Sequence, residues 1–127
     1  MAPSDENELS SCVATSTKIN DKPCAFRYPR GEGVGIKINE KPEIWKIGKG
    51  RMVRQGSKVC ILSLGTRLYD AIKASEILGS YGLPTSVADA RFAKPIDELL
   101  ITQLARDHEV LVSVEEGAVG GFSAQVM

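Results

Sequence analysis

An uninterrupted apolar segment, Lys-Val-Cys-Ile-Leu-Ser-Leu, occupies residues 58–64 and limits the folds open to this chain. Because it lacks alternation of polar and apolar residues, it is typical of a strand buried on both faces of a parallel sheet. Gly65 and Thr66 follow as turn residues, and the periodicity of residues 67–81 predicts a helix that ends at Gly82, a candidate left-handed C-cap. We expect the inward face of this helix to hold Leu68, Ala71, Ile72, Ser75 and Leu78.

The same alternation continues to residue 127. Residues 85–90 and 109–114 are predicted strands, and between them Pro95 and Asp97 open a predicted helix with an apolar face. A third helix is expected from about Phe122 and is little more than one turn long. This β-α-β-α-β-α order predicts an α/β fold with a mostly parallel sheet, right-handed crossovers and an incomplete carboxy-terminal end.

The first 57 residues have a different character. Residues 4–20 predict a helix with Ser4 as its N-cap, and residues 24–28 are a strand candidate closed by Pro29. Residues 36–57 are polar and rich in lysine and arginine, with a few apolar anchors and room for short strands. We therefore divide the chain into an amino-terminal remnant (1–35), a linker (36–57) and an α/β domain (58–127).

Composition excludes several classes of function. Sixteen basic side chains balance sixteen acidic ones, so no global field attracts nucleic acid or an anionic membrane. No apolar run is long enough to cross a bilayer, and the acidic amino terminus is not a secretory signal, so a cytoplasmic location is expected. Three distant cysteines and the single histidine, His108, lack the spacing of a zinc site or a disulfide framework.

Few residues are candidates for a site. The glycines at 31, 33 and 35 lead into a strand-like segment, which favours a hinge over a dinucleotide loop. Arg30 ends the string Arg-Tyr-Pro-Arg (27–30), where a guanidinium can hold a phosphate with two hydrogen bonds or remain a solvated side chain.

The other candidates follow the second and third strands of the α/β domain. Glu115 and Glu116 follow the third strand, as an acid–base pair or, as we favour, as local caps and ion-pair partners. Asp89 and Arg91 are expected to pair with each other, and His108 is expected to be solvated.

Three strings together carry a family resemblance. They are Met-Ala-Pro-Ser-Asp-Glu (1–6) with Phe-Arg-Tyr-Pro-Arg-Gly-Glu-Gly-Val-Gly (26–35), then Val-Ala-Asp-Ala-Arg-Phe-Ala-Lys-Pro-Ile-Asp (87–97), and Val-Glu-Glu-Gly-Ala-Val-Gly-Gly-Phe (114–122). In these strings the whole chain resembles the 1-deoxy-D-xylulose-5-phosphate synthase family of transketolase-like enzymes. Residues 1–35 resemble the end of its pyrimidine-binding domain, and residues 58–127 resemble its transketolase-type carboxy-terminal domain.

The resemblance implies a reaction and a set of partners. Such enzymes are homodimers that join pyruvate to glyceraldehyde 3-phosphate with loss of carbon dioxide, using thiamine diphosphate and Mg²⁺, and their product feeds isoprenoid, thiamine and pyridoxal synthesis. The family's cofactor motif, catalytic histidines and activating glutamate have no counterpart here, so we expect no catalytic, cofactor-binding or metal residue and no activity in the isolated chain. Arg30 alone matches a family site position, the arginine that holds the triose phosphate.

Two alternatives stay open. The chain could be an interaction module that complements a separately encoded amino-terminal piece, or a small phosphate-binding domain built on Arg30.

Overall fold

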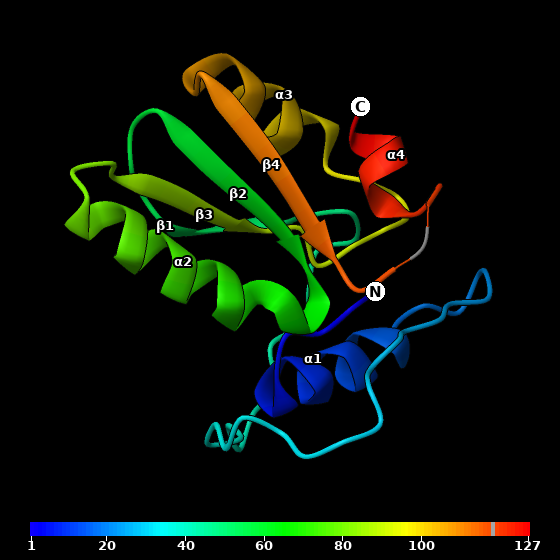
Figure 1. Cartoon of the computed structure of the whole chain (residues 1–127). Helices are drawn as coiled ribbons and strands as arrows, with labels where there is room; N and C mark the ends of the chain where they lie inside the picture. The colour runs from blue at the N-terminus through cyan, green and yellow to red at the C-terminus, as the bar shows by residue number, and fades with distance from the viewer. Residues whose placement is uncertain (118) are drawn as a thin grey trace.

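The computed structural model describes residues 1–117 and 119–127, and four strands of this part form one sheet (Figure 1). The strand order is β1-β3-β2-β4. The elements in chain order are α1 (Glu6–Ser16), β1 (Arg51–Arg54), β2 (Val59–Leu64), a 3₁₀ turn (Gly65–Arg67), α2 (Leu68–Ser80), β3 (Thr85–Asp89), α3 (Glu98–Asp107), β4 (Val110–Glu115) and α4 (Phe122–Val126). No helix in these residues is long and apolar enough to span a membrane.

The sheet is mostly parallel, as the sequence predicts. Strand β2 pairs in parallel with β3 on one side and with β4 on the other, so that Val59 lies between Thr85 and Val110. Strand β1 adds an antiparallel edge against β3, with an irregular register between Met52 and Arg54. The polar segment that we interpret as a linker therefore contributes one strand to this sheet.

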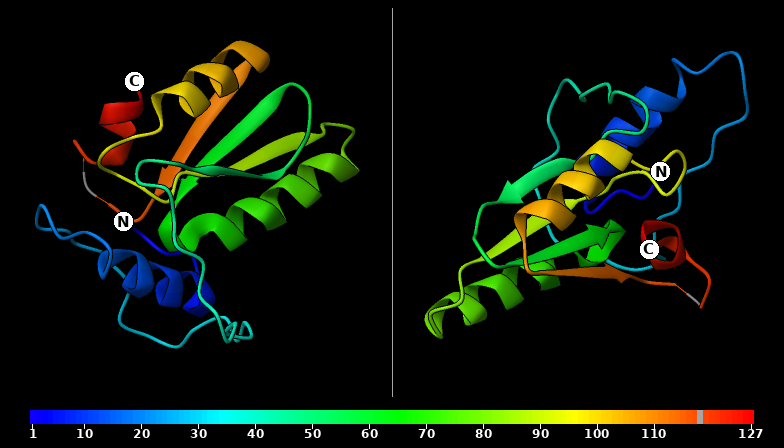
Figure 2. Two further views of the ribbon diagram at one scale, coloured as in Figure 1. Left: turned by 180° about the vertical axis from the view of Figure 1, so that it is seen from behind. Right: turned by 90° about the horizontal axis from the view of Figure 1, so that it is seen from above.

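Helices cover both faces of the sheet, which explains why β2 is apolar without alternation (Figure 2). On one face, Ile61 and Val87 pack against Leu68 and Ala71 of α2. The opposite face contributes the larger cluster, in which α3 and α4 pack on the strands; its buried members are Ala2, Cys60, Leu62, Leu64, Ala88, Ala90, Leu104 and Phe122. Alternate residues of β2 therefore pack into two different apolar cores, one on each face of the sheet.

Helix α1 lies beyond the carboxyl ends of the parallel strands (Figure 1). It is shorter than the predicted helix, and its N-cap is Asp5, whose side chain accepts a hydrogen bond from the amide of Glu8 at 2.8 Å. The prediction of Ser4 as N-cap is therefore wrong. The reason is tertiary, because Ser4 is buried while the Asp5 carboxylate also accepts a 2.8 Å hydrogen bond from Tyr69 of α2.

The predicted strand at residues 24–28 forms no regular strand. Its backbone contacts the first residue instead, because the Arg27 amide donates to the Met1 carbonyl at 3.0 Å and the Met1 amino group donates to the Ala25 carbonyl at 2.8 Å. Further along, Trp45 is buried against Phe92 and Cys12 in a small third core. This core holds the connecting segment between α1 and the sheet.

Candidate functional site

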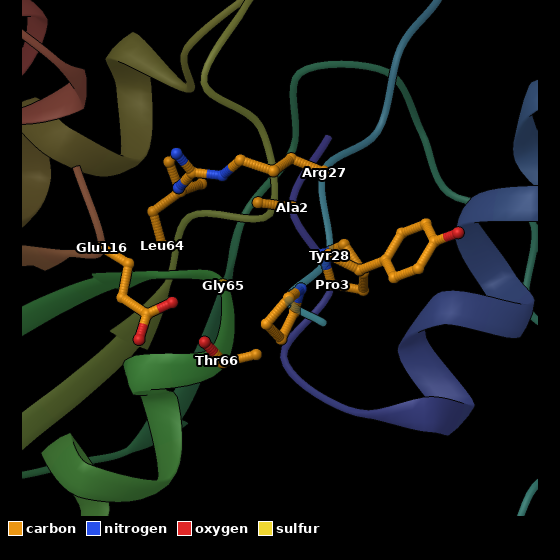
Figure 3. Close-up of a pocket in the computed structure, with 9 residues that line it drawn as sticks. Ala2, Pro3, Arg27, Tyr28, Leu64, Gly65, Thr66 and Glu116 are labelled. Carbon is orange, nitrogen blue, oxygen red and sulfur yellow. The ribbon is translucent and has the colours of Figure 1, made fainter. Parts of the chain in front are cut away.

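A cleft opens at the carboxyl end of β2, the edge where α/β sheets place their ligands (Figure 3). Its volume is about 130 Å³. Three stretches far apart in the sequence line it, together with Glu116 after β4: Ala2 and Pro3, residues 27–29, and residues 64–66. The cleft therefore lies between the amino-terminal remnant and the α/β domain.

The turn after β2 shapes the floor of this cleft. Gly65 has a φ of +78°, a left-handed conformation that favours glycine, and a Cβ there would also lie 3.4 Å from the Cβ of Ala2. The chain then passes through Thr66 into α2. The left-handed backbone, and not a lack of space for a Cβ, is what favours glycine at this position.

Arg27 supplies the positive charge of the cleft. Its backbone is held by the hydrogen bond to Met1, and its side chain extends across the cleft on the side of Leu64 (Figure 3). Within residues 1–117 and 119–127 its guanidinium forms no ion pair. An exposed guanidinium of this kind can bind an anion.

Arg30, the residue singled out by the sequence, lies outside the lining of this cleft. It is exposed, and it has no ion-pair partner in the part of the chain that the structure describes. The structure thus brings Arg27 and not Arg30 to the end of β2.

The two glutamates after β4 have local partners. Glu115 accepts a hydrogen bond from the amide of Ser123 at 3.1 Å and so caps α4, while Glu116 forms an ion pair with Arg67. Arg67 also pairs with Asp70 at 3.0 Å, and together the two carboxylates raise the pKa of its guanidinium. These contacts confirm the favoured interpretation of local capping and pairing.

A buried ion network lies where β3 ends. Arg91 is only 7% exposed, and its guanidinium binds Glu8 of α1 at 2.7 Å and Glu43 at 3.2 Å. Asp89 is fully buried and contacts Arg51 at 3.2 Å. Burial raises the pKa of Asp89 to about 6, against the pull of the Arg51 charge.

The expected pairing of Asp89 with Arg91 is wrong for the side chains. Only the Arg91 amide donates to the Asp89 carboxylate, at 3.1 Å, while the Arg91 guanidinium stacks 4.4 Å from the centre of the Trp45 ring. Glu8 is the partner that sequence reasoning missed. It lies 83 residues from Arg91, and no local pattern indicates such a contact.

His108 is not solvated as expected. Its Nδ1 lies 2.8 Å from the Leu104 carbonyl, which can only accept, and its Nε2 lies 2.7 Å from the Ser86 hydroxyl. The Leu104 carbonyl therefore accepts a hydrogen bond from a protonated Nδ1, and Nε2 lies within hydrogen-bonding distance of the Ser86 hydroxyl. This arrangement anchors the end of α3 to the start of β3.

Comparisons with known proteins agree with this geometry. A profile of the family described as "Transketolase, C-terminal domain" matches residues 48–127. A solved structure described as "Split gene transketolase, inactive beta4 tetramer" is 28% identical, with a TM-score of 0.86. The match covers 98% of this chain but only 41% of that chain, so the relative contains much more sequence than the one printed here.

Proposed function

Because this chain belongs to the transketolase carboxy-terminal domain family, we propose that it is the carboxy-terminal part of a split transketolase-type enzyme. We further propose that the complete enzyme makes 1-deoxy-D-xylulose 5-phosphate from pyruvate and glyceraldehyde 3-phosphate. The observation that carries the finer proposal is the set of three strings, 1–6 with 26–35, 87–97 and 114–122, which separate this synthase from transketolase itself. Residues from the first and third strings line one cleft, which supports a shared role.

Transketolase-type enzymes depend on thiamine diphosphate, which would supply the carbanion chemistry of the reaction. The described residues of this chain do not fit that cofactor, because they contain no group of three or more metal-ligating side chains to hold its Mg²⁺. In this proposal the cofactor belongs to an amino-terminal part of the enzyme, which is the partner of this chain.

The chain's own contribution is to bind the acceptor substrate. We propose that Arg30 forms charge-assisted hydrogen bonds to the phosphate of the triose and so fixes the position of its carbonyl group. Its exposure and its freedom from ion pairs within the described residues support this role. The domain division at 1–35, 36–57 and 58–127 belongs to the same proposal, with residues 1–35 completing the pyrimidine-binding domain of the partner.

Reconstitution tests this proposal. The purified chain alone should give no product from pyruvate and glyceraldehyde 3-phosphate, because it lacks the groups that activate thiamine. Addition of the amino-terminal part of such a synthase, with thiamine diphosphate and Mg²⁺, should restore product formation and give a complex that co-purifies. Product formation by the chain alone would refute the proposed division of labour.

One observation supports a second function. The structural relative, of which this chain spans 41%, is described as inactive, and a protein without catalytic activity can still bind a ligand. A free-standing phosphate-binding domain would then bind glyceraldehyde 3-phosphate without a partner. A lone exposed arginine should bind this ligand in the millimolar range or weaker, about −4 kcal/mol. Micromolar affinity in a calorimetric titration would favour the second function.

A further inference from the structure

Arg30 is followed by a loop with glycine at every second position, Gly-Glu-Gly-Val-Gly at residues 31–35, which we call the glycine loop. Every residue of the glycine loop is exposed, and none belongs to a helix or a strand. Because glycine restricts the backbone less than any other residue, such a sequence has little order of its own. A defined position for Arg30 therefore needs a contact from elsewhere in the chain.

The first turn of α1 supplies such a contact. The Gly35 amide donates a 2.8 Å hydrogen bond to Oε1 of Glu6, which precedes it by 29 residues in the sequence. Within residues 1–117 and 119–127, residues 28–38 make no other hydrogen bond. The carboxylate of Glu6 is thus the one polar anchor of the glycine loop in the described part of the chain.

The backbone of Arg30 lies between two anchored amides. These are the amide of Arg27, which bonds to the first residue of the chain, and the amide of Gly35. If Gly35 were released, the next anchored amide would be that of Asn39, which donates to another side chain of α1 at 2.9 Å. The free segment that contains Arg30 would then be longer and would sample more conformations.

The close approach of Glu6 to the glycine loop depends on one particular glycine. A Cβ at Gly33 would overlap the carboxyl group of Glu6, so this side chain lies directly against the backbone at residue 33. At Gly31 a Cβ would meet no atom within 4 Å. Of these two glycines, only Gly33 makes room for Glu6.

Packing contributes little to the position of the glycine loop. A cavity of about 340 Å³ lies between the loop and the start of α1. Pro29 and Gly31, the two neighbours of Arg30, line this cavity. Because a cavity provides no van der Waals contacts, the hydrogen bond to Glu6 is what holds the loop at its distance from the helix.

The Glu6 carboxylate is suited to hold an amide. The backbone amides of Glu6 itself and of Gly35 lower the pKa of this carboxyl, so it is ionised at neutral pH and forms charge-assisted hydrogen bonds. Its second oxygen, Oε2, is covered and has no hydrogen-bond partner among the described residues. A covered oxygen without a partner destabilises a fold, which argues against a purely structural role for Glu6.

We propose that Glu6 is a positioning residue for the acceptor substrate, whose carboxylate holds the glycine loop so that Arg30 is in place to bind the phosphate of the triose. The inference rests on the proposed function for the identity of the substrate. Glu6 acts through Arg30 and does not touch the substrate. Loss of Glu6 should therefore weaken triose binding only where Arg30 is present.

NMR relaxation of the isolated chain tests the effect on the loop. Glu6→Ala should lower the backbone order parameters of residues 31–35 to below about 0.6, because the anchor of the loop is lost. Asn7→Ala, which removes the neighbouring contact to the Asn39 amide, is the matched control and should leave these order parameters close to those of wild type. Unchanged order in the α2 amides of both variants establishes that each is folded.

Kinetics of the reconstituted enzyme test the link to Arg30. Glu6→Ala should raise the KM for glyceraldehyde 3-phosphate about threefold to tenfold, because binding must then order the loop, while kcat and the KM for pyruvate hardly change. In the Arg30→Ala enzyme the same substitution should change the KM for the triose less than about twofold. Glu6→Gln keeps an acceptor for the Gly35 amide and should stay within about twofold of wild type.

Two glycine variants test the contact from the side of the loop. Gly33→Ala should reproduce the effect of Glu6→Ala on the KM for the triose, because the added methyl group displaces the carboxyl from the Gly35 amide. Gly31→Ala restricts the backbone of the same loop without displacing Glu6, so it should raise this KM less than Gly33→Ala does.

The outcomes distinguish this inference from the proposed function. Unchanged loop order in Glu6→Ala overturns the inference and leaves the function standing. An equal rise in the KM for the triose with and without Arg30 also overturns it, as do equal effects of the two glycine variants. If the reconstituted wild-type enzyme forms no product, the proposed function falls, and the inference that rests on it falls too.

Discussion

Arg91 illustrates how the role of a single residue depends on distant partners. Its φ of +55° lies in the left-handed region, which is uncommon for a residue other than glycine. The conformation turns its guanidinium away from Asp89 and toward Glu8, Glu43 and the face of Trp45. We infer that the buried ion pair and the cation–π contact hold this backbone strain in place.

Asp89 should make the stability of the chain depend on pH. Its folded pKa of about 6 lies above the ordinary 3.8, so the folded protein binds a proton that the unfolded chain does not bind until lower pH. The buried charge therefore destabilises the fold at pH 7, and this effect disappears as the pH falls from about 6 to about 4. The pKa difference corresponds to a free energy on the order of 3 kcal/mol.

Comparison with Asp89→Asn isolates this effect. The urea unfolding free energy of wild type minus that of Asp89→Asn should shift in favour of wild type as the pH falls from 7.5 to 4, because only wild type takes up the proton. Asp70→Asn, at an exposed ion pair with Arg67, is the control and should show little such shift. A difference between wild type and Asp89→Asn that is constant with pH would contradict the assignment.

Arg30 and Arg27 can be compared within one string. In the reconstituted enzyme, Arg30→Ala should raise the KM for glyceraldehyde 3-phosphate by roughly tenfold to a hundredfold, because it removes a charge-assisted contact worth on the order of 1.5–3 kcal/mol. The KM for pyruvate should hardly change, since pyruvate carries no phosphate. Arg30→Lys should recover only part of the loss, because an ammonium group lacks the planar fork.

Arg27→Ala is the matched comparison and should have the smaller effect. Arg30 is the one position that matches the phosphate-binding arginine of the family, so loss of Arg30 and not of Arg27 should remove the direct contact to the phosphate. Arg27 lines the cleft at the end of β2, so the two variants compare an arginine inside this cleft with one outside it. A larger effect at Arg27 would move the phosphate site to that cleft.

At the scale of elements, the residue types at the helix ends predict where the helices begin and end. Helix α2 ends in two hydrogen bonds, from the Gly82 amide to the Gly79 carbonyl and from the Leu83 amide to the Leu78 carbonyl, both at 3.0 Å. This is a Schellman motif with Gly82 at φ +79°. At the other end of the domain, Asp97 caps α3 and also accepts hydrogen bonds from Lys49 and Gly50, which joins the linker to this helix.

Two glycines near the end of α2 should respond to alanine in opposite directions. Gly82→Ala should destabilise the chain by about 1 kcal/mol, because alanine resists the left-handed conformation. Gly79→Ala, inside the helix, should stabilise it by about 0.5–1 kcal/mol. A Cβ meets nothing within 4 Å at either position, so packing does not enter the comparison. Thermal unfolding of both variants measures the two effects, and equal shifts would contradict this account.

At the scale of the whole molecule, the interactions that stabilise the sheet and its helices differ from those that hold the amino-terminal part against them. The sheet and its helices form two apolar cores, with Leu62 and Val87 fully buried. The amino-terminal part is joined to them chiefly by polar contacts at Glu8, Arg91 and Tyr69, and by the small core around Trp45. A buried ion pair contributes less net free energy than an equal area of apolar burial, because the cost of removing both charges from water offsets much of their attraction.

This difference predicts unequal protection against hydrogen exchange. In the isolated chain, amides in residues 1–35 should exchange faster than those in residues 58–64 and 85–90, because α1 can separate without unfolding the sheet. Glu8→Ala should widen the gap by removing the buried partner of Arg91, whereas Glu6→Ala, which loses only a contact to the Gly35 amide, should have less effect. Equal protection in the two regions would indicate a single cooperative unit.

The sequence by itself determined the parallel α/β domain and the ends of its helices. Residues 58–64 could only be a strand buried on both faces, and Gly82 and Asp97 mark their helix ends because the signals are local and need no distant partner. Tertiary structure decided the rest. Asp5 rather than Ser4 caps α1 because its carboxylate also bonds to Tyr69. The partner of Arg91 is Glu8 of α1, and the position of the His108 ring depends on Ser86. Each of these contacts joins residues far apart in the chain, and only packing of the sheet brings them within hydrogen-bonding distance.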